Sequence, residues 1–334
     1  MYKLKTLDKS IISTLSYSAV KNWPMTSWEI FRYLTNPARI EDQHQSSGVS
    51  FGVVRKSLEG MMAKDIIYEK EGFYYFKKDS AKRVFPEKRD GQDKLSDLKI
   101  KKVTKITRWL QIFPFIRGIF LSGSLVFGWA EEQSDVDLLI ITQKNHLWTT
   151  RFLLSGLLTL LGLKRSRVRI KNRLCLNHFI TDHNPKISLY SLYNAETYAR
   201  LIPLCIEDKT LVDFLMANRW INDYILWGSG RYYQDIRRMP MVLWKKTLRS
   251  LFELLLIVLG GGVVLEKILR RWQIRHIKKD PLIYKKGGRV VADMSQIEFH
   301  PDSPEKQHLE SYNRQLISLK LFSSEPEHDS GLTR

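Results

Sequence analysis

Cysteine is scarce in this sequence, with Cys175 and Cys205 the only two among 334 residues. They have no paired spacing and no histidine-rich cluster beside them, which excludes a disulfide-stapled domain and argues against a structural zinc site. This usage is typical of a reduced compartment. Because the residues that follow Met1 also lack the apolar core of a secretory signal, we expect a cytoplasmic protein.

Apolar runs of membrane-spanning length are also lacking. Two uncharged apolar runs cover residues 152–163 and 254–265, and charged residues flank both of them. A spanning helix needs about 20 predominantly apolar residues. We therefore expect both runs to form buried core helices, and we expect no transmembrane span.

Acidic residues are outnumbered, 35 against 54 basic ones, so the net charge is +19. The excess is uneven, at +2 over residues 1–76 and +11 over residues 228–289. Five basic side chains in the latter segment recur at helical steps of three or four: Lys267, Arg270, Arg271, Arg275 and Lys278. Such a stripe can bind RNA, an anionic lipid surface or a polyphosphate, or it can be a solvated helix face.

Apolar residues are plentiful, at 43% of the chain, which excludes disordered and collagen-like classes. Residues 1–76 show three short helical patterns and then a hairpin with a turn at Glu71-Gly72. This order resembles a winged-helix domain, whose third helix, here residues 50–63, would enter the DNA major groove. Because the charges of this segment nearly balance, we prefer a scaffold or substrate-positioning role to autonomous DNA recognition.

Composition and periodicity divide the rest of the chain into four segments. They are a charged linker at residues 77–93, a central segment at 94–206, a helical and basic C-terminal region at 207–322, and a polar disordered tail at 323–334. Helical spacing is expected over residues 196–227, and three glycines at 260–262 should break or hinge a long helix. The predicted fold class is α+β, with a central α/β domain on a small mixed sheet.

The central segment carries the chemistry. A short apolar strand at residues 119–121 leads to Gly123-Ser124, and the sequence Ser134-Asp135-Val136-Asp137 opens a second apolar strand. Residues two apart on a strand share a face, so the two carboxylates should lie side by side. Neighbouring carboxylates repel each other unless a cation neutralises them, and oxygen ligands suit Mg²⁺ bound together with substrate phosphates.

These residues, Gly123-Ser124, Gly128 and Ser134-Asp135-Val136-Asp137, resemble the signature of the polymerase-beta-like nucleotidyltransferase superfamily. Residues 119–206 are similar to stand-alone bacterial and archaeal nucleotidyltransferase-domain proteins. The resemblance implies that Asp135 and Asp137 hold two Mg²⁺ ions. Gly123, Ser124 and Ser134 would bind the NTP, with ATP as the expected nucleotide, and a hydroxyl acceptor would attack it to release pyrophosphate. A protein, a small molecule or an RNA end all fit as acceptor.

Active members of this superfamily usually carry a third carboxylate on a later strand. The candidate strand here, residues 173–180, holds Asn177 at its middle and no acid, and Asp182 follows its end. Asp182 is our preferred third catalytic residue. Alternatively His178 acts as the base, although a core histidine is the commoner outcome, or the domain binds nucleotide without turnover. In that last case the protein is a nucleic-acid-binding regulator or an antitoxin-like protein with a degenerate nucleotidyltransferase domain.

Overall fold

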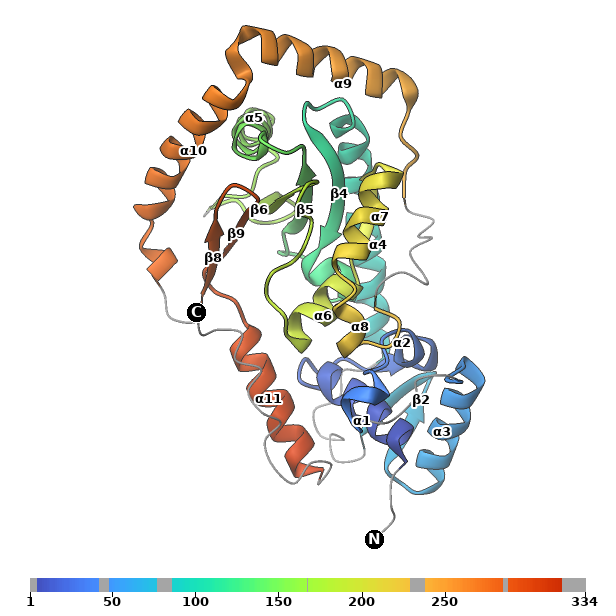
Figure 1. Cartoon of the computed structure of the whole chain (residues 1–334). Helices are drawn as coiled ribbons and strands as arrows, with labels where there is room; N and C mark the ends of the chain where they lie inside the picture. Colours follow the sequence, from blue (N-terminus) through green and yellow to red (C-terminus); the bar gives the residue numbers. More distant parts are fainter. Residues whose placement is uncertain are drawn as a thin grey trace.

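The computed structural model describes residues 5–41, 48–76, 86–166, 168–228, 238–284 and 288–319. It is a mixed structure of helices and sheets, in agreement with the predicted α+β class. Figure 1 shows a central sheet, with the N-terminal helices packed below it and a bent pair of helices around its upper rim. Residues 77–85 of the predicted linker and the predicted disordered tail at 323–334 lie outside the described residues.

The N-terminal part contains three α-helices, a 3-10 turn and a small antiparallel sheet of strand order β1-β3-β2. Its elements are α1 (Thr6–Ala19), β1 (Met25–Thr26), α2 (Ser27–Arg32), η1 (Pro37–Arg39), α3 (Phe51–Ala63), β2 (Ile67–Lys70) and β3 (Phe73–Phe76). Helix α2 begins with a capping box, in which the side chains of Thr26 and Glu29 each accept a hydrogen bond from the other's backbone amide. The predicted helices and hairpin are thus present.

The central sheet has six strands in the order β7-β4-β5-β6-β9-β8. Its strands are β4 (Ile116–Ser122), β5 (Val136–Thr142), β6 (Leu174–Thr181), β7 (Ile202–Ile206), β8 (Arg289–Ala292) and β9 (Gln296–His300). Strands β5 and β6 pair in parallel, whereas the other pairs are antiparallel. The prediction of a mixed sheet is confirmed, but the sheet is larger than expected because β8 and β9 join it from the C-terminal region.

Both faces of this sheet are covered, so the middles of β4 and β5, residues 119–121 and 138–141, are continuously apolar. One face packs against α4 (Pro86–Leu110) and α5 (Leu147–Leu160), and Leu138 and Ile140 belong to that core. Leu139 and Ile141 belong to the opposite core, with α6 (Leu192–Ala199), α7 (Asp208–Ala217) and α8 (Ile221–Tyr224). Successive side chains of β5 therefore point alternately into the two cores.

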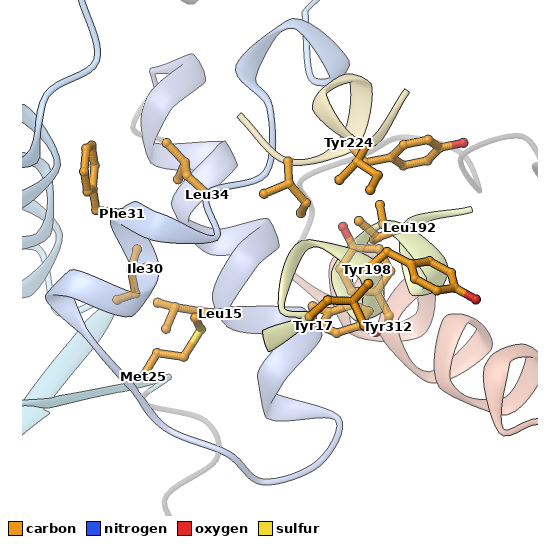
Figure 2. Packing of buried hydrophobic residues seen from close by; sticks show 14 of the residues in the cluster. Leu15, Tyr17, Met25, Ile30, Phe31, Leu34, Leu192, Tyr198, Tyr224 and Tyr312 are labelled. Atoms are coloured by element: carbon orange, nitrogen blue, oxygen red, sulfur yellow. The ribbon is translucent and has the colours of Figure 1, made fainter. Parts of the chain in front are cut away.

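The second core also includes the N-terminal helices and the C-terminal helix α11 (Glu305–Ser318). Figure 2 shows Leu15 and Ile30 in the same packed region as Tyr198 and Tyr312. The hydroxyls of Ser13 and Tyr312 lie 2.6 Å apart, across nearly the whole length of the chain. The N-terminal part is consequently built into the same hydrophobic core as the sheet.

Three sequence-based boundaries are corrected by the structure. The segment predicted to be helical over residues 196–227 contains strand β7, because this short apolar run is buried on both faces at the sheet edge. The C-terminal region is not wholly helical, since it supplies β8 and β9. Helix α4 begins at Pro86, so the last residues of the predicted linker are helical.

The remaining elements are α9 (Leu243–Leu256), the π-helical turn η4 (Ile257–Gly261), α10 (Val263–Lys278) and η5 (Pro281–Tyr284). The predicted glycine hinge is present, because α9 and α10 are bent by 85° at this point. The run at residues 254–265 does not form a buried core helix, since most of its large apolar side chains are exposed. Of the run at 152–163, Leu154 and Leu158 are buried but Leu160 is exposed.

Among the described residues, no single helix has both the length and the apolar composition to cross a membrane. Taken together, the bent pair of α9 and α10 passes that test by length and composition.

Candidate functional site

The two predicted aspartates come together at the start of β5. Asp135 directly precedes the strand, and Asp137 is its second residue, opposite Cys175 of the parallel neighbour β6. One ligand atom from each of these three residues lies within 4.8 Å of the others. The structure therefore places two carboxylates and a thiol where a single cation can reach them.

Gly123 lies directly against Asp137. Strand β4 ends at Ser122, which pairs with Asp137, and Gly123 follows at the start of η3 (Gly123–Phe127). Its φ is +71°, and a Cβ atom there would lie 2.9 Å from Asp137 Cγ and closer still to Oδ2. Only glycine fits this position, so the predicted Gly123-Ser124 bend does lie beside the carboxylates. Ser124 is half-buried in η3.

The loop before Asp135 is held by a lysine that the sequence did not single out. Lys99 of α4 donates to the carbonyl oxygens of Glu131 (2.6 Å), Glu132 (3.1 Å) and Ser134 (2.8 Å). The Ser134 hydroxyl accepts a hydrogen bond from the amide of Glu131 at 2.9 Å. Ser134, which the sequence assigned to the nucleotide, therefore closes this loop and fixes the approach to Asp135.

Electrostatically, the site carries more negative charge than its partners neutralise. Burial, with the neighbouring Asp135 adding to it, raises the pKa of Asp137 to about 6, although Arg165 acts in the opposite direction. Arg165 pairs with Asp135, with 3.0 Å between Nε and Oδ2. Asp137 therefore keeps its proton almost to neutral pH. A bound cation would remove the repulsion between the two carboxylates and favour the deprotonated form of Asp137.

Asn177 occupies the place where the third carboxylate was expected. The register between β5 and β6 shifts between Asp137 and Leu139, so the partner strand carries an additional residue there. Asn177 Nδ2 donates to Asp137 Oδ1 at 3.2 Å and lies 3.3 Å from His300 Nδ1. Its amide can orient Asp137, but it cannot act as a base.

Asp182, the predicted third catalytic residue, is not brought to the aspartate pair by the structure. It follows Thr181, which pairs with Thr142 at the opposite end of β5 from Asp137. Thr142 lies five residue steps along β5 from Asp137, which is about 16 Å at the usual rise. Asp182 instead accepts a hydrogen bond from the amide of Lys144 at 2.9 Å, which fixes the turn after β5.

His178 is a core residue. Its ring nitrogens lie 3.3 Å from the Tyr198 hydroxyl and 3.3 Å from Gln296 Nε2. Burial, assisted by Arg289, lowers its pKa to about 3. A buried neutral imidazole with both nitrogens engaged is the structural histidine that we judged the commoner outcome.

Two residues near the site come from β9 and were missed from the sequence. Burial lowers the pKa of His300 to about 4, so its ring is neutral at pH 7. Glu298 is fully buried, and it is bound by Arg289 and by Gln296 Nε2, the latter at 3.1 Å. Both lie more than a hundred residues after Asp137 in the chain, and no local pattern indicates that this strand joins β6.

The donor set fits Mg²⁺ better than a softer metal. Burial raises the pKa of the Cys175 thiol to about 12, and Asp137 adds to the effect. Cys175 therefore stays protonated near pH 7, whereas only the deprotonated thiolate binds metal. Two carboxylates remain as ligands, and Mg²⁺ is usually held by one or two carboxylates together with waters and phosphate oxygens.

A separate cavity of about 630 Å³ lies between α5 and α10. Arg151, Lys164 and Trp272 are among its lining residues, and none of the candidate site residues lines it. This hollow is therefore distinct from the aspartate pair.

Comparison of the chain with known protein families, with curated proteins and with solved structures finds no match in any of the three.

Proposed function

We propose that this chain is a Mg²⁺-dependent nucleotidyltransferase, which moves a nucleoside monophosphate from an NTP to a hydroxyl acceptor and releases pyrophosphate. The observation that carries the proposal is the packing of Gly123 against Asp137, with Asp135 beside it. A glycine-serine bend and a pair of carboxylates in contact form a site for a metal-bound triphosphate. The resemblance of residues 119–206 to the polymerase-beta-like superfamily supports the same reaction.

In this proposal Asp135 and Asp137 hold the metal, with two ions expected. Bound Mg²⁺ supplies charge neutralisation for the attacking and leaving oxygens of the displacement. Gly123 and Ser124 admit the phosphates close to the backbone because residue 123 has no side chain. Arg165, which now pairs with Asp135, is the cation placed to balance phosphate charge when the metal takes over the carboxylate.

Proton transfer needs a group other than a third carboxylate on β6. Asn177 stands in that position and has no basic atom. His300, neutral at pH 7 and next to Asn177, is our candidate for the acceptor of the hydroxyl proton. This base is weak, so we expect slow turnover. The acceptor remains a protein hydroxyl, a small molecule or an RNA end, and the cytoplasm remains the proposed location.

Labelling with α-³²P NTPs tests the proposal. The wild type is incubated with each nucleotide and Mg²⁺ or Mn²⁺, alone and with cell extract, beside Asp135→Asn, Asp137→Asn and the matched control Asp182→Asn. We expect labelled acceptor with the wild type and with Asp182→Asn, and none with the other two variants. If a folded wild type labels nothing, or if Asp137→Asn labels as well as the wild type, the proposal is wrong.

The presence of Asn177 at the third position favours one alternative, a nucleotide-binding domain without turnover. The chain would then be a regulator or antitoxin-like protein, with the winged-helix-like N-terminal part as its nucleic-acid or protein contact. Helix α3 does not favour a strong DNA clamp, because Arg55 on it pairs with Glu59 at 3.7 Å. In this alternative, nucleic-acid affinity persists in Asp137→Asn and labelling is absent throughout.

A further inference from the structure

Helix α9 is amphipathic, but its charged side faces the protein and its apolar side faces outward. Its buried residues are the charged Lys245 and Arg249. Its outward face carries large exposed apolar side chains, namely Leu243, Trp244, Leu251, Phe252, Leu254 and Leu255. A solvated helix presents the opposite arrangement, so this outer face is suited to an apolar surrounding.

The inward polar face of α9 is firmly bonded to the central domain. Lys245 Nζ donates to the carbonyl of Arg108 at 2.7 Å, and Arg249 donates to the carbonyl of Ile116 at 2.8 Å. Glu253 accepts from the amide of Phe115 at 2.7 Å. These bonds fix which side of the helix faces outward, so the exposure of its leucines is built into the fold.

Helix α10 repeats the arrangement. Glu266 is completely buried and accepts from the amides of Trp148 and Thr149, both at 2.8 Å. Gln273 Nε2 donates to the carbonyl of Trp148 at 2.9 Å. The exposed apolar residues of this helix are Val263, Val264, Ile268 and Trp272. Both helices thus bury polar groups and expose large apolar side chains, although Leu269, Ile274 and Ile277 of α10 pack against the core.

The bend between the helices makes this apolar surface a projecting ridge. Figure 1 shows α9 across the top of the molecule and α10 down its side, meeting at an outer corner. Val258 and Leu259 lie at the bend with exposed fractions of 73% and 74%, and Ile257 is exposed beside them. An apolar patch of this extent marks an interaction site.

Within α9 and α10, both of which the structure describes, every exposed charged side chain is basic. Both acidic residues of α9 and α10, Glu253 and Glu266, are engaged with the protein on the inner side. The exposed charged residues of α10 are Lys267, Arg271, Arg275 and Lys278, all from the predicted basic stripe. Two copies of this surface would repel each other, whereas an anionic surface would attract it.

We infer that the ridge formed by residues 243–278 docks on the surface of an anionic phospholipid bilayer. The projecting corner at residues 257–264 enters the interface, with its apolar side chains among the acyl chains and the basic side chains of α10 at the headgroups. The inner-face hydrogen bonds keep both helices on the protein body, so docking needs no refolding. This inference does not depend on the aspartate pair. Of the partners considered for the basic stripe, namely RNA, an anionic lipid surface and a polyphosphate, it selects the lipid surface.

Vesicle flotation with the full chain tests this inference. Vesicles of phosphatidylcholine are compared with vesicles of phosphatidylcholine and phosphatidylglycerol, at low and high salt. We expect the wild type to float with the anionic vesicles, and less at high salt. The triple variant Val258→Ser/Leu259→Ser/Val264→Ser and the charge variant Arg271→Glu/Arg275→Glu should each lose about tenfold or more in vesicle affinity.

Val168→Ser/Val212→Ser is the matched control, because both valines are exposed elsewhere on the surface. It and Asp137→Asn should float like the wild type. The inference is overturned if the wild type ignores anionic vesicles, or if the triple variant floats equally well. It is also overturned if the wild type, by analytical ultracentrifugation, is a dimer that the triple variant dissociates, since a second copy would then cover the ridge.

Discussion

Gly123 and Asp137 constrain each other, because the backbone at residue 123 has a positive φ and leaves no space for a side chain. We expect Gly123→Ala to lower the free energy of unfolding by about 1 to 2 kcal/mol and to weaken Mn²⁺ binding by displacing the Asp137 carboxylate. Urea denaturation and a Mn²⁺ titration measure the two effects. Gly156→Ala is the control, because residue 156 lies in α5 with open space around it, and it should be neutral or stabilising.

The elevated pKa of Asp137 predicts a specific pH dependence. Folding raises this pKa from 3.8 to about 6, so the folded state holds the proton more tightly than the unfolded state. The associated stability is fully present below pH 3.8 and is lost as the pH rises through about 6. Urea denaturation of the wild type should show this loss, and Asp137→Asn should not.

Metal binding should show the opposite trend, because the ligand is the deprotonated carboxylate. We expect Mn²⁺ affinity to rise as the pH passes through about 6. A metal affinity that does not change between pH 5 and pH 7 would contradict the assignment of Asp137 as a ligand.

At the level of elements, α4 positions the site through one side chain. Lys99 binds three carbonyl oxygens of the loop that leads into Asp135. We expect Lys99→Met to cost about 2 kcal/mol of stability, since the bonds to this charged group are lost, and to weaken Mn²⁺ binding. Lys101→Met, an exposed change on the same helix, should alter neither quantity. Unchanged Mn²⁺ affinity in Lys99→Met would show that the loop does not depend on α4.

The comparison between sequence and structure also differs from element to element. Strands β4 and β5 follow from short apolar runs next to Gly123 and Asp137, and the pair Thr26 and Glu29 marks where α2 begins. Strand β7 was missed because a short apolar run fits a buried strand or a helix equally well. Its Pro203 is tolerated because β7 is an edge strand.

For the site itself, spacing within one segment predicted the Asp135, Asp137 and Gly123 cluster, but not what surrounds it. The placement of Asp182 could not be predicted, because the length of β6 sets its distance from Asp137 and the strand register is not encoded locally. Lys99, Arg165 and His300 reach the site from other elements. Contacts of this kind depend on tertiary packing, for which a single sequence offers no periodic signal.

Across the whole molecule, the N-terminal helices, the sheet and α11 share one core. We therefore expect a single cooperative unfolding transition. A cavity in the part of this core that α11 contributes should strongly lower the free energy of unfolding. Leu316→Ala, at a side chain that is 1% exposed, should lower the free energy of unfolding by about 2 to 5 kcal/mol. Calorimetry and tryptophan fluorescence should report the same shifted midpoint.

Ile317→Ala provides the comparison for this change, because the next side chain along α11 is 40% exposed. Its cost should be below about 1 kcal/mol. Two separate transitions in the Leu316→Ala variant, with the N-terminal part melting by itself, would show that this part is an independent domain.

The most direct measurement is a calorimetric titration of ATP into the protein with and without Mn²⁺, for the wild type, Asp137→Asn and Asp182→Asn. The account predicts metal-dependent ATP binding by the wild type and by Asp182→Asn, with affinity at least about tenfold weaker in Asp137→Asn. ATP binding that needs no metal, or that persists unchanged in Asp137→Asn, would contradict it.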